Sequence, residues 1–250
     1  MMQIVLAQLE NPAFQLLLVA VFVAGIVRGF SGFGTGMIVG PIGSALFTPK
    51  LALVILLVMD TFPTIPLVLP ALKKVVWREV LPMAVGVMLV MPLGIVLLKY
   101  GDVIVLRWFF SLVIFTAVAI LWSGWHYRGP RTYRISALVG GMSGFLGGVS
   151  GLSGPPPIIY WMAARTGAGL VRANLIILFS ISEVISIAGY YIASIITWEG
   201  VLKGLIASPI YFVGLMIGAK LFGKASEMIY RRVAFTLILM AAIISMPLFD

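Results

Sequence analysis

The chain has 250 residues, of which 62% are hydrophobic and 10% are charged. Soluble domains are about 45–50% apolar and about 25% charged, and a mean hydropathy of +1.15 leaves too little polar surface to cover a globule in water. The composition therefore excludes a soluble protein and indicates a polytopic membrane protein. Because the net charge of +9 comes from basic residues in short loops between apolar runs, we expect no nucleic-acid partner.

Rare residue types exclude several kinds of site. The chain has no cysteine, which excludes disulfides, thiolate nucleophiles and thiolate metal ligands. Its one histidine, His126, is too few for a histidine metal site or a haem site. Two GxSG strings contain Ser31 and Ser153, but a serine nucleophile needs a nearby base, and the histidine lies in a predicted loop. We therefore expect no metal, no cofactor and no enzymatic activity.

A series of apolar stretches follows the N-terminal segment. About 20 residues are needed for a helix to cross the membrane, and six stretches have about that length: 51–72, 80–98, 103–122, 173–195, 201–222 and 233–249. Two others, 14–48 and 135–166, are longer and rich in glycine and proline, which weaken or interrupt helices. Close helix packing through small residues is the alternative explanation of the glycines. The excess length favours a broken or re-entrant helical hairpin in each.

The two halves of the chain resemble each other. Each begins with a glycine-rich long stretch and continues with the shorter spans, which predicts two transmembrane repeats of one broken hairpin followed by three transmembrane helices. We place an N-terminal segment at 1–13, the repeats at 14–124 and 136–250, and a connecting loop at 125–135. The residue pairs that a shifted comparison aligns are Gly34 with Gly148, Gly40 with Gly154, Pro41 with Pro155, Asp60 with Glu183 and Trp77 with Trp198.

Basic residues predict the orientation of the repeats, because cytoplasmic loops carry an excess of Lys and Arg. If each long stretch returns to its starting side, most of the basic residues fall on one side of the membrane. The repeats are then inverted relative to each other, the connecting loop is cytoplasmic, and both termini are extracytoplasmic. The residues gathered on the cytoplasmic side are Lys73, Lys74, Arg78, Arg128, Arg131, Arg134, Arg165, Arg172, Lys220, Lys224, Arg231 and Arg232.

The helix breaks are candidate anion sites. A helix N-terminus offers free N–H groups and the positive end of the helix dipole. Hydroxyl donors are available from Ser31 and Thr35 in the first break and from Ser150 and Ser153 in the second. Arg28 precedes the first break inside an apolar segment, where an unpaired guanidinium is costly. Its partner is either a bound anion or an acidic side chain.

Two acidic residues lie inside predicted spans at matching places in the repeat. Asp60 and Glu183 are each near the middle of an apolar helix, where acidic side chains mark ion or proton pathways. We expect them to couple transport to protons or cations. A fixed salt bridge with Arg28 is the structural alternative.

The strings GFSGFGTGMIVGPIGSALF and GGMSGFLGGVSGLSGPPPIIYW resemble the paired motifs of the TauE/SafE sulfite and organosulfonate exporter family, also called the toluene sulfonate uptake permease family. The resemblance covers nearly the whole chain and implies a carrier of small sulfur-containing anions. Our comparison aligns Arg28 with Met142, so a symmetric pair of arginines is not expected. Motif residues carried over are Gly29, Ser31, Gly32, Gly34, Thr35, Gly36, Gly148, Ser150, Gly151, Ser153, Gly154 and Pro155.

These features together predict a secondary transporter that exports small sulfur-containing organic anions across the bacterial inner membrane by alternating access, coupled to protons. The site residues expected to bind the anion are Arg28 with the motif residues of both breaks. The alternatives are an anion channel, an assembly factor, or a carrier of another carboxylate or of a cation. The glycine-rich faces permit a homodimer.

Overall fold

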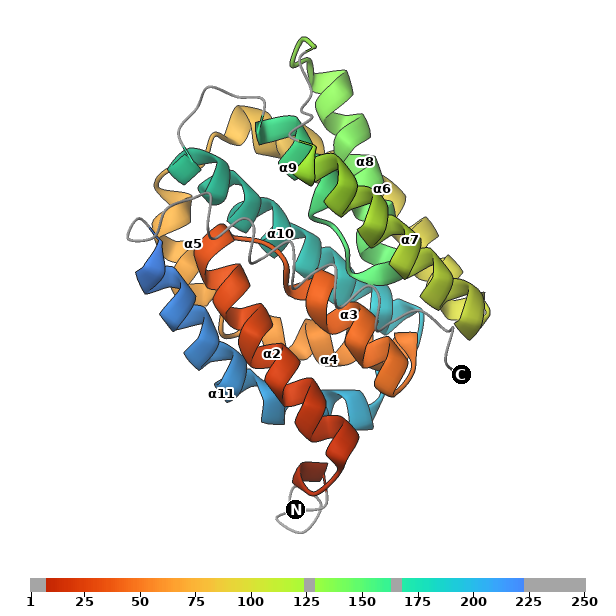
Figure 1. The fold of residues 1–250 in the computed structure, drawn as a ribbon. Coiled ribbons are helices and arrows are strands. Elements are labelled where there is room, and N and C mark those ends of the chain that lie inside the picture. The colour runs from red at the N-terminus through yellow and green to blue at the C-terminus, as the bar shows by residue number, and fades with distance from the viewer. Residues whose placement is uncertain (1–7, 124–128, 163–167, 223–250) are drawn as a thin grey trace.

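The computed structural model describes residues 8–123, 129–162 and 168–222, and the regular structure in these ranges is α-helical (Figure 1). The N-terminal half contains α2 (Pro12–Ser31), α3 (Thr35–Leu46), α4 (Pro49–Thr61), α5 (Ile65–Leu72), α6 (Trp77–Tyr100) and α7 (Val103–Trp122). The C-terminal half contains α8 (Tyr133–Ser150), α9 (Pro155–Met162), α10 (Ala168–Ile192) and α11 (Trp198–Leu221). The predicted span at 233–249 and residues 125–128 of the connecting loop lie outside the described residues.

Five described helices are long and apolar enough to cross a membrane, namely α2, α6, α7, α10 and α11. The pair α4 and α5 makes a sixth span if the two are counted together, and they meet at a bend of 59°. The stretch 51–72, which the sequence predicted as a span, therefore consists of two helices that meet at this bend. Pro63 lies at the bend and has no N–H to donate to the carbonyl of Met59; that carbonyl instead accepts a hydrogen bond of 3.4 Å from Ser208 of α11.

Both long glycine-rich stretches are interrupted and turn back, as the sequence predicted. In the first, a Cβ at Gly43, late in α3, would lie 3.6 Å from Leu17, early in α2. In the second, the hydroxyls of Ser136, early in α8, and Tyr160, late in α9, are hydrogen-bonded at 2.9 Å. In each stretch the end of the second helix therefore lies beside the start of the first.

The two halves of the chain pack against each other through two closely packed helix pairs. α2 of the first half packs along α11 of the second, and α6 of the first half packs along α8 of the second. Glycines allow this approach: a Cβ at Gly25 would lie 2.6 Å from the carbonyl oxygen of Tyr211, and one at Gly144 would lie 2.8 Å from that of Val87. Small residues at membrane helix interfaces let backbones meet in this way. The glycines of these pairs are thus occupied by packing within one chain.

Candidate functional site

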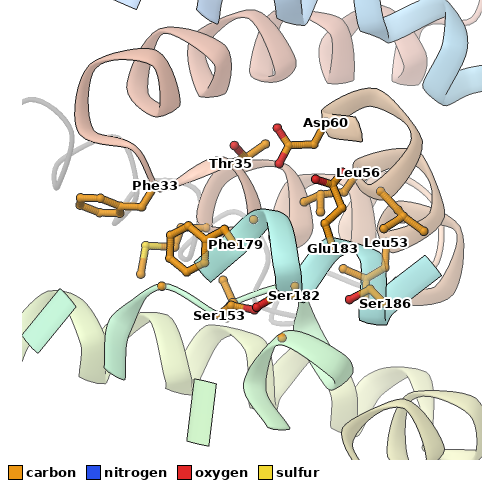
Figure 2. A pocket seen from close by; sticks show the side chains of 18 of the residues that line it. Phe33, Thr35, Leu53, Leu56, Asp60, Ser153, Phe179, Ser182, Glu183 and Ser186 are labelled. Carbon is orange, nitrogen blue, oxygen red and sulfur yellow. The ribbon is translucent and has the colours of Figure 1, made fainter. Parts of the chain in front are cut away.

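A cavity lined by residues of both helix breaks lies inside the helix bundle (Figure 2). A Cβ at Gly36, in the first turn of α3, would overlap the carbonyl oxygen of Gly151 in the second break, so the two breaks are in contact. The cavity offers about 80 Å³ to the centres of water molecules, several times the ~10–15 Å³ that one water needs on this measure. It therefore has room for a small ion.

The two breaks have the same local cause. α2 ends where Gly32 adopts a left-handed conformation with φ of 82°, and α8 ends where Gly151 does so with φ of 71°; glycine has no Cβ to oppose this conformation. The serine before each glycine donates its hydroxyl back along its own helix, Ser31 to Val27 and Ser150 to Leu146, each at 2.7 Å. The hydroxyls of Ser31 and Ser150 are therefore engaged with their own helices.

Matching the two left-handed glycines gives a different alignment of the two halves of the chain at the breaks. With Gly32 matched to Gly151, the position equivalent to Arg28 is Gly147 and not Met142. The alignment from sequence paired Gly34, which follows the left-handed Gly32, with Gly148, which precedes the left-handed Gly151. Gly147 also lines the cavity, and a Cβ there would overlap the hydroxyl of Ser153. In this alignment, too, Arg28 has no basic counterpart in the second half.

The two breaks differ in the N–H groups that they offer. The first turn of a helix leaves N–H groups without intrahelical partners. At α3 the N-cap is Gly34, which makes no side-chain cap, and Gly34, Thr35 and Gly36 line the cavity. Helix α9 instead begins with three prolines, from Pro155, which have no N–H. The positive helix end at the cavity is therefore supplied chiefly by α3.

Arg28 is held at the cavity wall by groups from two other helices. Its guanidinium lies 3.5 Å from a carboxylate oxygen of Asp60 on α4 and 5.1 Å from the ring centre of Phe179 on α10. Asp60 also accepts a hydrogen bond from the hydroxyl of Tyr211 on α11, which lies 2.9 Å from the hydroxyl of Thr35 on α3. The Nε of Arg28 is buried and has no hydrogen-bond partner among the described residues.

The second acidic residue, Glu183, faces the same cavity from α10. Its carboxylate accepts a hydrogen bond of 2.8 Å from Thr61, which follows Asp60 in α4. Figure 2 shows Asp60, Glu183 and Thr35 on neighbouring walls, with Phe33 and Phe179 at one side. Two carboxylates and one guanidinium thus share one small space.

The structure brings together most of the residues selected from the sequence. Arg28, both acidic residues and part of each break line the cavity, whereas the remaining motif residues face helices or loops. Gly29 and Gly148 pack against α11 and α6, and Gly32 lies beside Arg172. The predicted residues that line the cavity are Arg28, Gly34, Thr35, Gly36, Asp60, Gly151, Ser153, Gly154 and Glu183, and those that do not are Gly29, Ser31, Gly32, Gly148, Ser150 and Pro155.

Several important neighbours were missed by sequence reasoning. Tyr211 and Thr61 contact the two carboxylates, but a hydroxyl in an apolar helix carries no distinguishing signal. Arg172 of α10 was counted only as a topology marker. Its guanidinium donates to the carbonyls of Gly29 at 2.5 Å and Phe30 at 3.0 Å, and so caps the last turn of α2 beside the break.

In the part of the chain that the structure describes, no group of three or more His, Cys, Asp or Glu side chains is placed to hold a metal ion. The spans, the interrupted hairpins and the buried charged cavity define a multi-pass membrane protein with an internal polar site. The sequence model of the sulfite exporter TauE/SafE family matches residues 17–246, so the chain belongs to this family. Membership confirms the resemblance noted in the motifs and implies membrane transport of sulfite or organosulfonates rather than enzymatic activity.

A curated relative agrees with this assignment. A protein from Cupriavidus necator described as "Probable sulfite/organosulfonate exporter TauE" is 27% identical over 223 residues, and the match covers 82% of each chain. No solved structure matches the chain significantly.

Proposed function

We propose that the chain is a secondary transporter that exports a small sulfonate or sulfite anion across the bacterial inner membrane, with the cavity between the helix breaks as its binding site. The observation that carries the proposal is the Nε of Arg28, a buried cationic donor with no partner among the described residues at the wall of an ion-sized cavity. An oxyanion accepts from such a donor with a strong charge-assisted hydrogen bond. The first turn of α3, whose N-cap Gly34 makes no side-chain cap, adds the positive end of a helix.

The charge of the cavity supports coupling to protons. With both carboxylates ionised, Asp60 and Glu183 outnumber Arg28, and the excess negative charge opposes an anion. A proton on either carboxylate removes that opposition. By linkage, an anion that binds better to the protonated cavity also increases proton binding. Anion and proton would then cross in the same direction, so export by this mechanism would be driven by the higher concentration of the anion inside the cell.

The packing supports alternating access by two inverted repeats. If α2 corresponds to α8 and α6 corresponds to α11, the contact of α2 with α11 is equivalent to the contact of α8 with α6. The helices α6 and α11 also begin at the matched residues Trp77 and Trp198. Inverted repeats with broken helices at a central site are a recurring design of secondary transporters. We propose that one repeat moves against the other around the cavity, which is formed within one chain and needs no second copy.

Basic side chains support the proposed orientation. Contacts of Arg78 with Tyr133 and of Arg131 with Glu79 bring the starts of α6 and α8 together, and Asn174 joins the start of α10 to Val76. This basic end is proposed to be cytoplasmic, which would place both termini outside. The test is a reporter that is active only in the cytoplasm, fused after Asp250. Activity of this reporter would contradict the proposed orientation.

The test of the function is transport by the purified protein in liposomes. We expect saturable flux of isethionate, sulfoacetate or sulfite, and faster efflux when the same anion is present on the opposite side, as a carrier allows. Arg28→Gln should reduce the flux strongly, whereas Arg78→Gln, an equal change of charge at an exposed position, should not. Unsaturable flux would indicate a channel, and flux of a divalent cation or no flux at all would refute the proposal.

A further inference from the structure

A chain of three hydroxyl and carboxyl groups links one acidic residue to the cavity. Thr35, on α3, lines the cavity, and its hydroxyl is hydrogen-bonded to Tyr211, which in turn is hydrogen-bonded to Asp60. All three side chains are buried. We propose that Tyr211 relays the protonation state of Asp60 to the hydroxyl of Thr35 and so couples proton binding to anion binding. This inference rests on the proposed function.

The direction of the hydrogen bonds follows from the number of protons. An ionised carboxylate only accepts, so the hydroxyl proton of Tyr211 is directed to Asp60. The oxygen of Tyr211 is then the acceptor for Thr35, whose single hydroxyl proton is used in this bond. Thr35 presents only lone pairs to the cavity in this state, and lone pairs repel an anion.

Protonation of Asp60 reverses the chain. The carboxyl group now has a proton to donate to Tyr211, Tyr211 donates to Thr35, and the hydroxyl proton of Thr35 is free to point into the cavity. Both hydrogen bonds of the chain are kept in the reverse direction, so the one donor that the reversal releases is the Thr35 hydroxyl, which lines the cavity. The added proton comes from water, and no covalent bond changes other than the O–H bond formed at Asp60.

The surrounding charges act in the same direction. The titratable groups that face Asp60 are Arg28 on α2, Glu183 on α10 and Tyr211 on α11. Protonation weakens the attraction of Asp60 for the guanidinium, which becomes available to the anion. Glu183 is not part of the relay, because its partner Thr61, whose one hydroxyl lies within hydrogen-bond distance of both Glu183 and its own helix, does not line the cavity.

The test compares the affinity for isethionate across acid and alkaline pH, with the full chain in lipid nanodiscs. A sulfonate stays ionised throughout, so any pH dependence belongs to the protein. We expect wild-type affinity to fall as pH rises. Tyr211→Phe leaves Thr35 free to donate in both states, so it should bind isethionate roughly tenfold more tightly than wild type at alkaline pH and similarly at acid pH.

Two further variants make the result specific. Thr35→Val lacks the donor and should lose roughly tenfold in affinity at acid pH, and the double variant should lose the alkaline gain of Tyr211→Phe. Thr35→Ser keeps the hydroxyl and should behave as wild type. This result would show that the loss in Thr35→Val comes from the missing hydroxyl and not from a change in the fold. The matched control is Tyr160→Phe, which removes a buried tyrosine hydroxyl bonded to Ser136 and away from the cavity.

The outcomes distinguish the relay from the function on which it rests. An equal loss of affinity at all pH values in Tyr211→Phe, or an unchanged pH dependence, would overturn the relay. If the wild type bound no sulfonate at any pH, the proposed function would fail and the relay with it. A tighter complex in Tyr211→Phe only at alkaline pH supports the relay, because a merely structural role would weaken binding.

Discussion

The ion pair between Arg28 and Asp60 leads to a prediction about stability. At the N–O separation of 3.5 Å, an effective dielectric constant of about 20 gives an attraction of about 4–5 kcal/mol. Desolvation costs several kcal/mol for each ion, so the intact pair contributes little net stability. Removal of one partner leaves a buried charge, at a cost of about 3–5 kcal/mol. We therefore expect Arg28→Gln to lower the free energy of unfolding by about that amount at neutral pH.

Thermal unfolding in detergent, at one scan rate, measures this effect. A loss of 1 kcal/mol lowers Tm by about 2–4 °C in a chain of this size, so Arg28→Gln should lower it by about 6–20 °C. Adding Asp60→Asn removes the unpaired carboxylate and should restore most of the loss, and Arg78→Gln should change little. An equal deficit in the single and double variants would refute the reasoning.

Two further predictions concern the helix contacts around the site. Gly25→Ala places a Cβ 2.6 Å from the carbonyl of Tyr211 and should destabilise the protein by about 1–3 kcal/mol, whereas Gly169→Ala, which has nothing within 4 Å, should not; equal Tm values would contradict this packing. Arg172→Lys should increase amide exchange at the end of α2, because an ammonium cannot match the planar fork of the guanidinium on two carbonyls, and unchanged exchange would exclude the capping role.

The sequence predicted the parts of the fold that depend on local chemistry. Glycine and proline in stretches too long for one span located both helix breaks, and acidic residues inside apolar helices identified Asp60 and Glu183. The bend between α4 and α5 was missed, although Pro63 and Pro66 lie there, because the stretch had the expected length for one span. Length alone thus conceals a broken span.

The rest of the site depends on contacts between distant parts of the chain. Tyr211 lies far from Asp60 in sequence, and only the packing of α11 on α2 and α4 brings their side chains together. The equivalence of Arg28 with Gly147 required the backbone conformation at Gly32 and Gly151. The many glycines in both stretches allow several alignments of the two halves, and sequence comparison alone does not distinguish among them.

The two closely packed helix pairs have a consequence for biogenesis. A ribosome completes α2 and α6 before it reaches α8 and α11, the helices on which they pack. Until then, the glycine-lined faces of the first half meet lipid or the insertion machinery, and the backbone at its break lacks its partner from the second break. The first half is therefore expected to be inserted in the membrane before its helices can form their final contacts. Tertiary assembly is consequently expected late, after most of the chain has been synthesised.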